Sequence, residues 1–155
     1  MSPGERAARV REALAQAEQL RQARRFKEGI DLLVEALRYG VDKAQVYFRL
    51  GNLYFDAGDL DRAEYAYSRA VQEDPRHASA HHNLGVVYRK QGRISASVKM
   101  LKKARLLELR YPPKVEVNEG QRRFLKALAW RLTLIPLGFL VAVLLLLWVV
   151  GRFFR

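Results

Sequence analysis

Residues 46–75 read VYFRLGNLYFDAGDLDRAEYAYSRAVQEDP, and residues 80–109 read AHHNLGVVYRKQGRISASVKMLKKARLLEL. The two stretches align without a gap at an offset of 34 residues. The matched positions carry leucine, glycine, tyrosine or alanine in both: Leu50 and Leu84, Gly51 and Gly85, Tyr54 and Tyr88, Gly58 and Gly92, Ala70 and Ala104. A fixed period of this length is typical of repeat proteins, in which each unit buries its apolar face against the next.

The residue types within one unit predict two antiparallel helices joined by a short turn. Gly51 and Ala63 are small, so two helices can approach closely there, and large residues such as Tyr67 fill the space between them. Gly58 is expected to end the first helix, because glycine adopts a positive φ without a Cβ penalty. Asp59 follows and is the predicted N-cap of the second helix.

This pattern resembles the tetratricopeptide repeat (TPR), a helix-turn-helix unit with small and aromatic residues at fixed places. The resemblance implies an all-α helical-repeat solenoid of about three units. We expect the following segments: an N-terminal tail at 1–9, a degenerate first unit at 10–43, and further units at 44–77 and 78–111. In the first unit Ala17 stands where Gly51 stands in the second, and Arg24 replaces the turn glycine. About three stacked units are the usual minimum for a stable array.

A long apolar run lies near the other end of the sequence. No charged residue occurs between 133 and 151, and a membrane-spanning helix needs about 20 predominantly apolar residues. We therefore expect a transmembrane helix at 132–151, a basic juxtamembrane linker or helix at 112–131, and a short basic tail at 152–155. These features are typical of a single-pass, tail-anchored protein.

The first residues lack the apolar region of a signal peptide, and basic residues are more numerous before the apolar run than after it. We therefore expect the repeat domain on the cytoplasmic face of the membrane. The Ala- and Arg-rich composition favours a bacterial inner membrane over an organelle membrane.

Positive charge is concentrated next to the apolar run. The chain has a formal net charge of +12, of which +7 falls in 78–111 and +3 in 112–131. Such charge next to a membrane segment is attracted to anionic headgroups. The residues expected at the membrane surface are Lys99, Lys102, Lys103, Arg122, Arg123, Lys126 and Arg131. The alternative is an ordinary solvated basic face; nucleic acid is not an expected partner, because no nucleic-acid module accompanies the charge.

The sequence carries no pattern of catalytic residues. The chain has no cysteine, no phosphate-binding glycine loop and no nucleophile elbow. His77 and His81 are four residues apart and would share a helix face, but no acidic or cysteine ligand completes a metal site. We expect no enzyme activity, no metal and no cofactor.

The resemblance implies that the first helices of successive units line a concave groove. The groove residues implied by this register are Phe48, Arg49, Asn52, Phe55, His82, Asn83, Val86, Arg89 and Lys90. Some TPR proteins bind a C-terminal carboxylate through a clamp of lysine, asparagine and arginine, and Asn52 and Asn83 fall on two clamp positions. Phe48 holds the position of the clamp lysine, so we do not expect a clamp of that type.

The expected function is that of a membrane-anchored scaffold or adaptor. It would bind a protein partner at the cytoplasmic membrane face, as a subunit or assembly factor of a membrane complex. In one alternative the transmembrane helix is the main interaction element, since Gly138 and Ala142 would allow close helix packing. In another, the chain is an organelle-membrane adaptor resembling mitochondrial fission adaptors.

Overall fold

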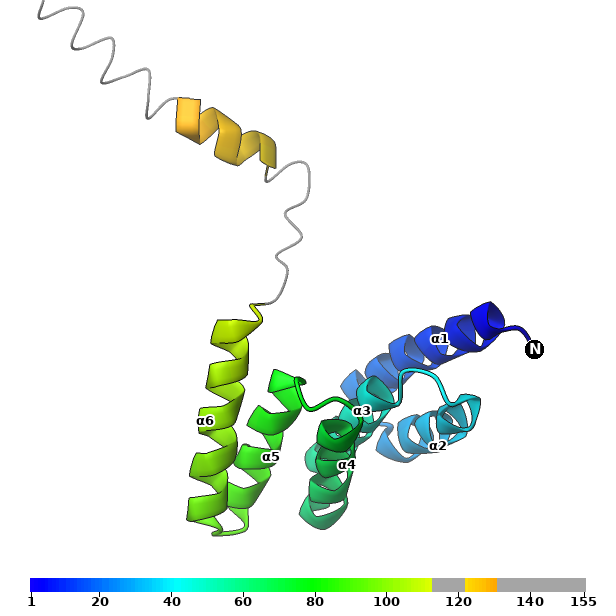
Figure 1. Cartoon of the computed structure of the whole chain (residues 1–155). Helices are drawn as coiled ribbons and strands as arrows, with labels where there is room; N and C mark the ends of the chain where they lie inside the picture. Colours follow the sequence, from blue (N-terminus) through cyan, green and yellow to red (C-terminus); the bar gives the residue numbers. More distant parts are fainter. Residues whose placement is uncertain (113–121, 131–155) are drawn as a thin grey trace, which may run out of the picture. The chain divides into compact units, whose positions relative to one another are not determined.

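The computed structural model describes residues 1–112 and 122–130. Within them the chain is helical and contains no strand. The first compact unit, residues 1–113, contains these helices: α1 (Pro3–Gln22), α2 (Phe26–Ala36), the 3-10 helix η1 (Leu37–Tyr39), α3 (Lys43–Asp56), α4 (Leu60–Glu73), α5 (Ala78–Lys90) and α6 (Ile94–Arg110). Three helical hairpins follow one another along the chain, as Figure 1 shows for α1–α2, α3–α4 and α5–α6. The expected all-α repeat solenoid is confirmed.

The helix ends follow the local sequence. Gly58 has a φ of 84°, and Asp59 caps α4 by accepting a hydrogen bond from the backbone N–H of Arg62 at 3.0 Å, as expected. Arg24, in the corresponding turn of the first hairpin, adopts the same left-handed conformation with a φ of 60°. The turn geometry is therefore kept in the first unit although its glycine is absent.

The first helix begins earlier than the sequence analysis placed it. α1 starts at Pro3, inside the segment expected as a tail at 1–9. Ser2 and Glu5 form a reciprocal capping box, in which the Ser2 hydroxyl accepts from the Glu5 N–H and the Glu5 carboxylate accepts from the Ser2 N–H. Proline at the first helical position has the φ that a helix needs, so the helix starts there.

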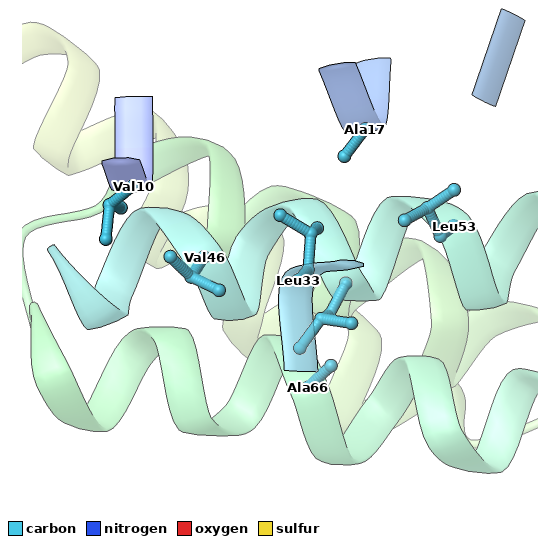
Figure 2. Packing of buried hydrophobic residues seen from close by; sticks show 7 residues of the cluster. Val10, Ala17, Leu33, Val46, Leu53 and Ala66 are labelled. Carbon is cyan, nitrogen blue, oxygen red and sulfur yellow. The ribbon is translucent and has the colours of Figure 1, made fainter. Parts of the chain in front are cut away.

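The core consists of two apolar clusters, and both include residues of α4. One apolar cluster joins Val10 and Ala17 of α1 to Leu33 of α2, Val46, Leu50 and Leu53 of α3, and Ala66 of α4 (Figure 2). A second cluster joins Ala63 and Tyr67 of α4 to Leu84 and Val87 of α5. Each hairpin thus buries its apolar face against its neighbour, which is how repeat arrays gain stability.

The close approach predicted at Gly51 is also present. A Cβ added there would lie 2.5 Å from Cδ1 and Cε1 of Tyr67, so only glycine fits between α3 and this ring. In the first unit Ala17 and Leu33 occupy the equivalent buried positions. In the third unit Gly85 faces Leu101, and an added Cβ would lie 2.9 Å from Leu101 Cγ, so glycine is needed there as well.

The second compact unit of the chain, residues 114–155, follows the repeats and contains one described helix, at 122–130. Its exposed side chains include Phe124, Leu125 and Leu128. Among the described residues, no helix combines the length and hydropathy required to cross a bilayer. The predicted span at 132–151 and the basic residue Arg131 lie outside the described ranges.

Candidate functional site

A cavity of about 300 Å³ opens on one face of the repeats. Its walls come from four helices, so the solenoid fold itself assembles it. The lining residues are Arg21 from α1, Asn52, Phe55 and Asp56 from α3, Tyr67 from α4, and Asn83 and Val86 from α5.

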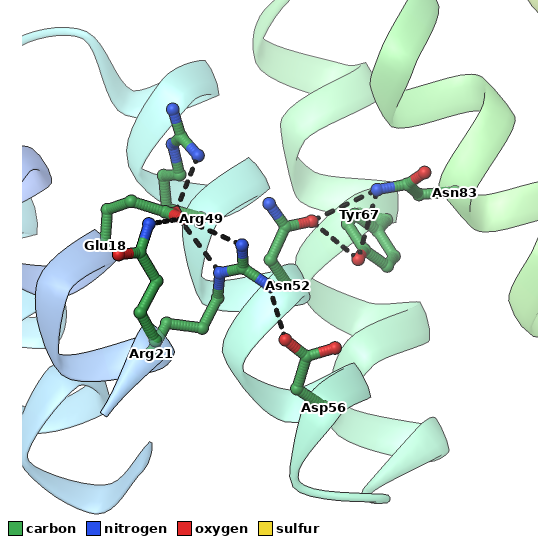
Figure 3. A network of polar contacts seen from close by, with 8 residues as sticks. Glu18, Arg21, Arg49, Asn52, Asp56, Tyr67 and Asn83 are labelled. Carbon is green, nitrogen blue, oxygen red and sulfur yellow. Dashed lines mark hydrogen bonds and ion pairs between the residues drawn. The ribbon is translucent and has the colours of Figure 1, made fainter. Parts of the chain in front are cut away.

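The floor of the cavity is a three-residue hydrogen-bond network (Figure 3). The Tyr67 hydroxyl donates to Oδ1 of Asn52 at 2.8 Å, and Nδ2 of Asn83 donates to the same oxygen at 3.1 Å. Nδ2 of Asn83 also lies 3.3 Å from the Tyr67 hydroxyl oxygen. Tyr67 is only 1% exposed, and this burial raises the pKa of its hydroxyl. The network thus fixes the two asparagine amides from adjacent repeats in one orientation.

One polar atom of each amide remains available. Within the described part of the chain, Nδ2 of Asn52 and Oδ1 of Asn83 form no hydrogen bond, and neither is among the buried polar atoms that lack a partner. They lie at opposite ends of the amide pair in Figure 3. The cavity therefore offers one hydrogen-bond donor and one acceptor at fixed positions, which is the complement of a peptide backbone.

A network of ion pairs joins α1 to α3 beside the floor (Figure 3). Arg21 pairs with Glu18 at 2.8 Å and with Asp56 at 2.5 Å, and Arg49 pairs with Glu18 at 2.9 Å. The hydrogen bond from Arg21 is the main cause that lowers the pKa of Glu18, and burial opposes it. The same bond to Glu18 raises the pKa of Arg21. Both groups stay charged, so this wall of the cavity carries balanced charges.

The remaining wall is apolar with a cation above it. Phe55 and Val86 contribute the apolar surface. The ammonium of Lys90 lies 5.4 Å from the centre of the Phe55 ring, within the range of a cation–π contact. The cavity thus combines an amide floor, an ion-pair wall and an apolar wall.

The structure brings only part of the predicted groove set together. Asn52, Phe55, Asn83 and Val86 line the cavity, and Lys90 covers Phe55. His82 and Arg89 are exposed on α5 but do not line it. The other two predicted residues, Phe48 and Arg49, are already engaged within the fold.

Phe48 packs against the core. Its ring centroid lies 4.7 Å from that of His77 and 6.0 Å from that of Tyr67. Arg49 binds Glu18 of α1, as described above. Both side chains hold repeats together, which limits their availability for a ligand.

Sequence reasoning missed the contribution of the first repeat. Glu18 and Arg21 lie 34 residues before Asn52 and Phe55, so the repeat offset itself carries this information. The predicted groove set contains residues of the second and third units and none of the first. The Tyr67 hydroxyl was also missed, because the ring was assigned only a packing role.

The histidines serve the fold. Nδ1 of His77 accepts from the backbone N–H of Ala80 at 3.2 Å and caps α5, and Nε2 lies 3.2 Å from Oε1 of Gln45. His81 is buried, with Nε2 3.1 Å from the carbonyl oxygen of Pro75. In residues 1–112 and 122–130 no cluster of three or more histidine, aspartate or glutamate side chains is arranged to hold a metal ion.

Comparison with known families adds to the geometry. Residues 51–92 match the family model described as TPR repeat. This part of the chain is similar to the TPR repeat. A TPR repeat-containing protein of Pseudomonas aeruginosa is 41% identical over 56 residues, which are 36% of this chain and 53% of that protein. The photosystem I assembly protein Ycf3 of Prochlorococcus marinus is 30% identical over 71 residues, which are 44% of this chain and 41% of that protein.

The TPR fold also matches solved structures. A crystal structure of MamA superposes with a TM-score of 0.61 and 25% identity, over 65% of this chain and 59% of that one. The chain spans about half the length of the curated relatives it matches, 53% and 41% in the two cases above. TPR repeats are typical of proteins that bind protein partners.

Proposed function

We propose that this chain is a membrane-anchored TPR scaffold that holds a protein partner in the cavity between its repeats. An extended segment of the partner would lie along the groove, with its backbone bonded to the two asparagine amides. The scaffold would act by binding alone and would perform no catalysis.

The observation that carries the proposal is the pair of available amide atoms. Nδ2 of Asn52 donates and Oδ1 of Asn83 accepts, and the bonds to Tyr67 hold both in place before any ligand arrives. Such preorganisation lowers the entropic cost of binding. The neighbouring apolar wall at Phe55 and Val86 would take an apolar side chain of the same segment.

Membrane attachment is the second part of the proposal. The uncharged run at 133–151 is long enough to span a bilayer, and we propose it as the anchor. The repeat domain would then lie on the cytoplasmic face, in keeping with the basic residues that precede the run. A bacterial inner membrane is the proposed location.

The role of assembly factor draws on the relatives. Ycf3 is named as an assembly protein for photosystem I. We propose by analogy that the chain holds one component of a membrane complex while others join. The partner itself would be a protein with an exposed, extended segment.

The groove is tested by capture of the partner from native membranes with the full chain as bait. Asn52→Ala and Asn83→Ala each remove one hydrogen bond to the ligand backbone. At about 1 kcal/mol per hydrogen bond, each should raise the Kd about fivefold. Gln72→Ala on α4 is the matched control, since Gln72 is an exposed amide away from the cavity. Thermal unfolding checks that each variant is folded at the temperature of capture. Equal capture by all the folded variants would exclude the groove.

The anchor is tested by replacing 132–151 with an unrelated apolar helix. A groove-based scaffold keeps its partner after this exchange. Loss of the partner would instead identify the membrane segment as the main interaction element. Fractionation of the source cell gives the third outcome, because enrichment in an organelle membrane would favour the fission-type adaptor.

A further inference from the structure

The outer face of α6, the last helix of the solenoid, lacks a packing partner within residues 1–112. Ser97 and Ala104 are buried on its inner side, and Leu101 packs there against Gly85. On the outer side Val98 is 45% exposed, Leu106 is 67% exposed and Leu109 is 73% exposed. Solitary exposed apolar residues are ordinary, but several on one helix face indicate an interaction surface.

The α6 helix is strongly basic, and two of its cations lie on the same face. α6 carries five lysine or arginine side chains and one acidic side chain, Glu108. Lys102 follows Val98 by four residues, and Arg105 precedes Leu109 by four, so cations and apolar side chains share one stripe. We call this stripe, Val98, Lys102, Arg105, Leu106 and Leu109, the α6 face.

The basic and apolar side chains of the α6 face together favour a lipid surface as the binding partner. A helix with basic and apolar side chains together binds the boundary between headgroups and acyl chains, where anionic phosphates meet the cations and the apolar side chains enter the acyl region. A second copy of this chain would present the same positive face and would be repelled. The helix at 122–130 contains Arg122, Arg123 and Lys126 and therefore has the same sign of charge.

We propose that the α6 face lies on the headgroup region of an anionic phospholipid bilayer. Val98, Leu106 and Leu109 would reach the acyl boundary, and Lys102 and Arg105 would bind lipid phosphates. The inference rests on the proposed membrane attachment. The uncharged run begins at 133, 23 residues after α6 ends at Arg110, so the anchor would keep α6 near the lipid surface at a high effective concentration.

The chain itself supplies a labelling strategy. It contains no cysteine, so a single introduced cysteine is a unique position for a fluorophore. Leu106→Cys places the label on the α6 face. Val34→Cys is the matched control, because Val34 is an exposed apolar residue on α2 of the first repeat. The full chain is reconstituted in lipid discs that contain a spin-labelled lipid as quencher.

Discs with and without anionic lipid distinguish the contribution of the cations to lipid binding from that of the apolar side chains. In discs of phosphatidylcholine with phosphatidylglycerol, the label at 106 should be quenched and the label at 34 should not. In phosphatidylcholine alone, or at high salt, quenching at 106 should be largely lost. The double variant Lys102→Gln, Arg105→Gln should lower the ratio of lipid-bound to unbound α6 face roughly thirtyfold, because each cation near an anionic surface contributes about 1 kcal/mol.

Three results would overturn the proposal. The first is absence of quenching at 106 in anionic discs, and the second is equal quenching in both lipid compositions. The third is a shift in emission at 106 that depends on protein concentration, because such a shift would indicate that a second copy of the chain covers this face. If the chain does not enter discs at all, the proposed anchor fails. The same labelled chain is then mixed with phosphatidylglycerol vesicles, where absence of quenching overturns the α6 face independently.

Discussion

The ring of Tyr67 occupies the space that a side chain at Gly51 would fill, since a Cβ at Gly51 would lie 2.5 Å from two ring carbons. The same tyrosine carries the hydroxyl that orients Asn52 in the floor of the cavity. A packing contact inside one repeat therefore determines the geometry of the candidate site.

Gly51→Ala should destabilise the fold and distort the site together. Overpacking in a core costs about 1–3 kcal/mol, which exceeds the gain of about 1 kcal/mol from replacing glycine by alanine in a helix. Urea unfolding measures the loss. Gly4→Ala is the control, because an added Cβ there meets only the Ser2 hydroxyl at 3.9 Å. Equal stability of both variants would show that the Tyr67 ring can move away at little cost.

Tyr67→Phe should cost about 1–2 kcal/mol of unfolding free energy, because the hydrogen bonds of the hydroxyl with Asn52 and Asn83 are lost while the ring stays. The variant should also change the alkaline limit of stability. Burial raises the pKa of Tyr67, so the unfolded chain releases this proton first, and wild-type stability falls once the pH exceeds the usual tyrosine pKa of about 10. The fall should be shallower in Tyr67→Phe, as measured by urea unfolding at several alkaline pH values. An unchanged slope would contradict this role for Tyr67.

Acid should weaken the junction between the second and third repeats. Burial lowers the pKa of His77 and of His81, and nearby Asp74 opposes this effect at both. The unfolded chain then binds protons more readily, so the free energy of unfolding decreases as the pH falls below about 6.5. Protonation of His77 at Nδ1 also removes the cap of α5.

His77→Asn isolates the contribution of His77 to this acid effect. Asparagine is a good N-cap and does not titrate in this range, so the variant should lose less stability between neutral and acidic pH. His82→Asn on the same helix is the control, since His82 is exposed. Unfolding midpoints measured across the pH range make the comparison. The same acid sensitivity in all three proteins would refute the assignment to His77.

Arg21→Gln should loosen α1 from α3, because it removes the ion pair between Arg21 of α1 and Asp56 of α3, together with the pair to Glu18 within α1. These side chains are about one-third exposed, so solvent screening limits the loss to about 1 kcal/mol, and salt should reduce it further. Faster amide hydrogen exchange in α1 would report the loosening. Arg25→Gln removes an exposed pair with Glu28 inside the first hairpin and should leave exchange in α1 unchanged.

The repeat period allowed much of the fold to be predicted from sequence. Gly58 and Asp59 were placed at the turn because glycine and an N-cap residue leave a clear local signal, whereas α1 was started too late because the Ser2–Glu5 capping box was not recognised. The site was predicted only in part. Phe48 has the register of a groove residue, but its ring packs against His77 and Tyr67, and such a choice depends on neighbouring helices that one sequence does not specify.

The hydrogen bond between Asn52 and Asn83 has a mechanical consequence, since it joins the second repeat to the third. A ligand bonded to both amides would oppose any change in the angle between these repeats. Ligand affinity and solenoid curvature would therefore be thermodynamically linked. A ligand that favours one angle between the repeats would bind less tightly when a force imposes another angle, and the coupling free energy is the same in both directions.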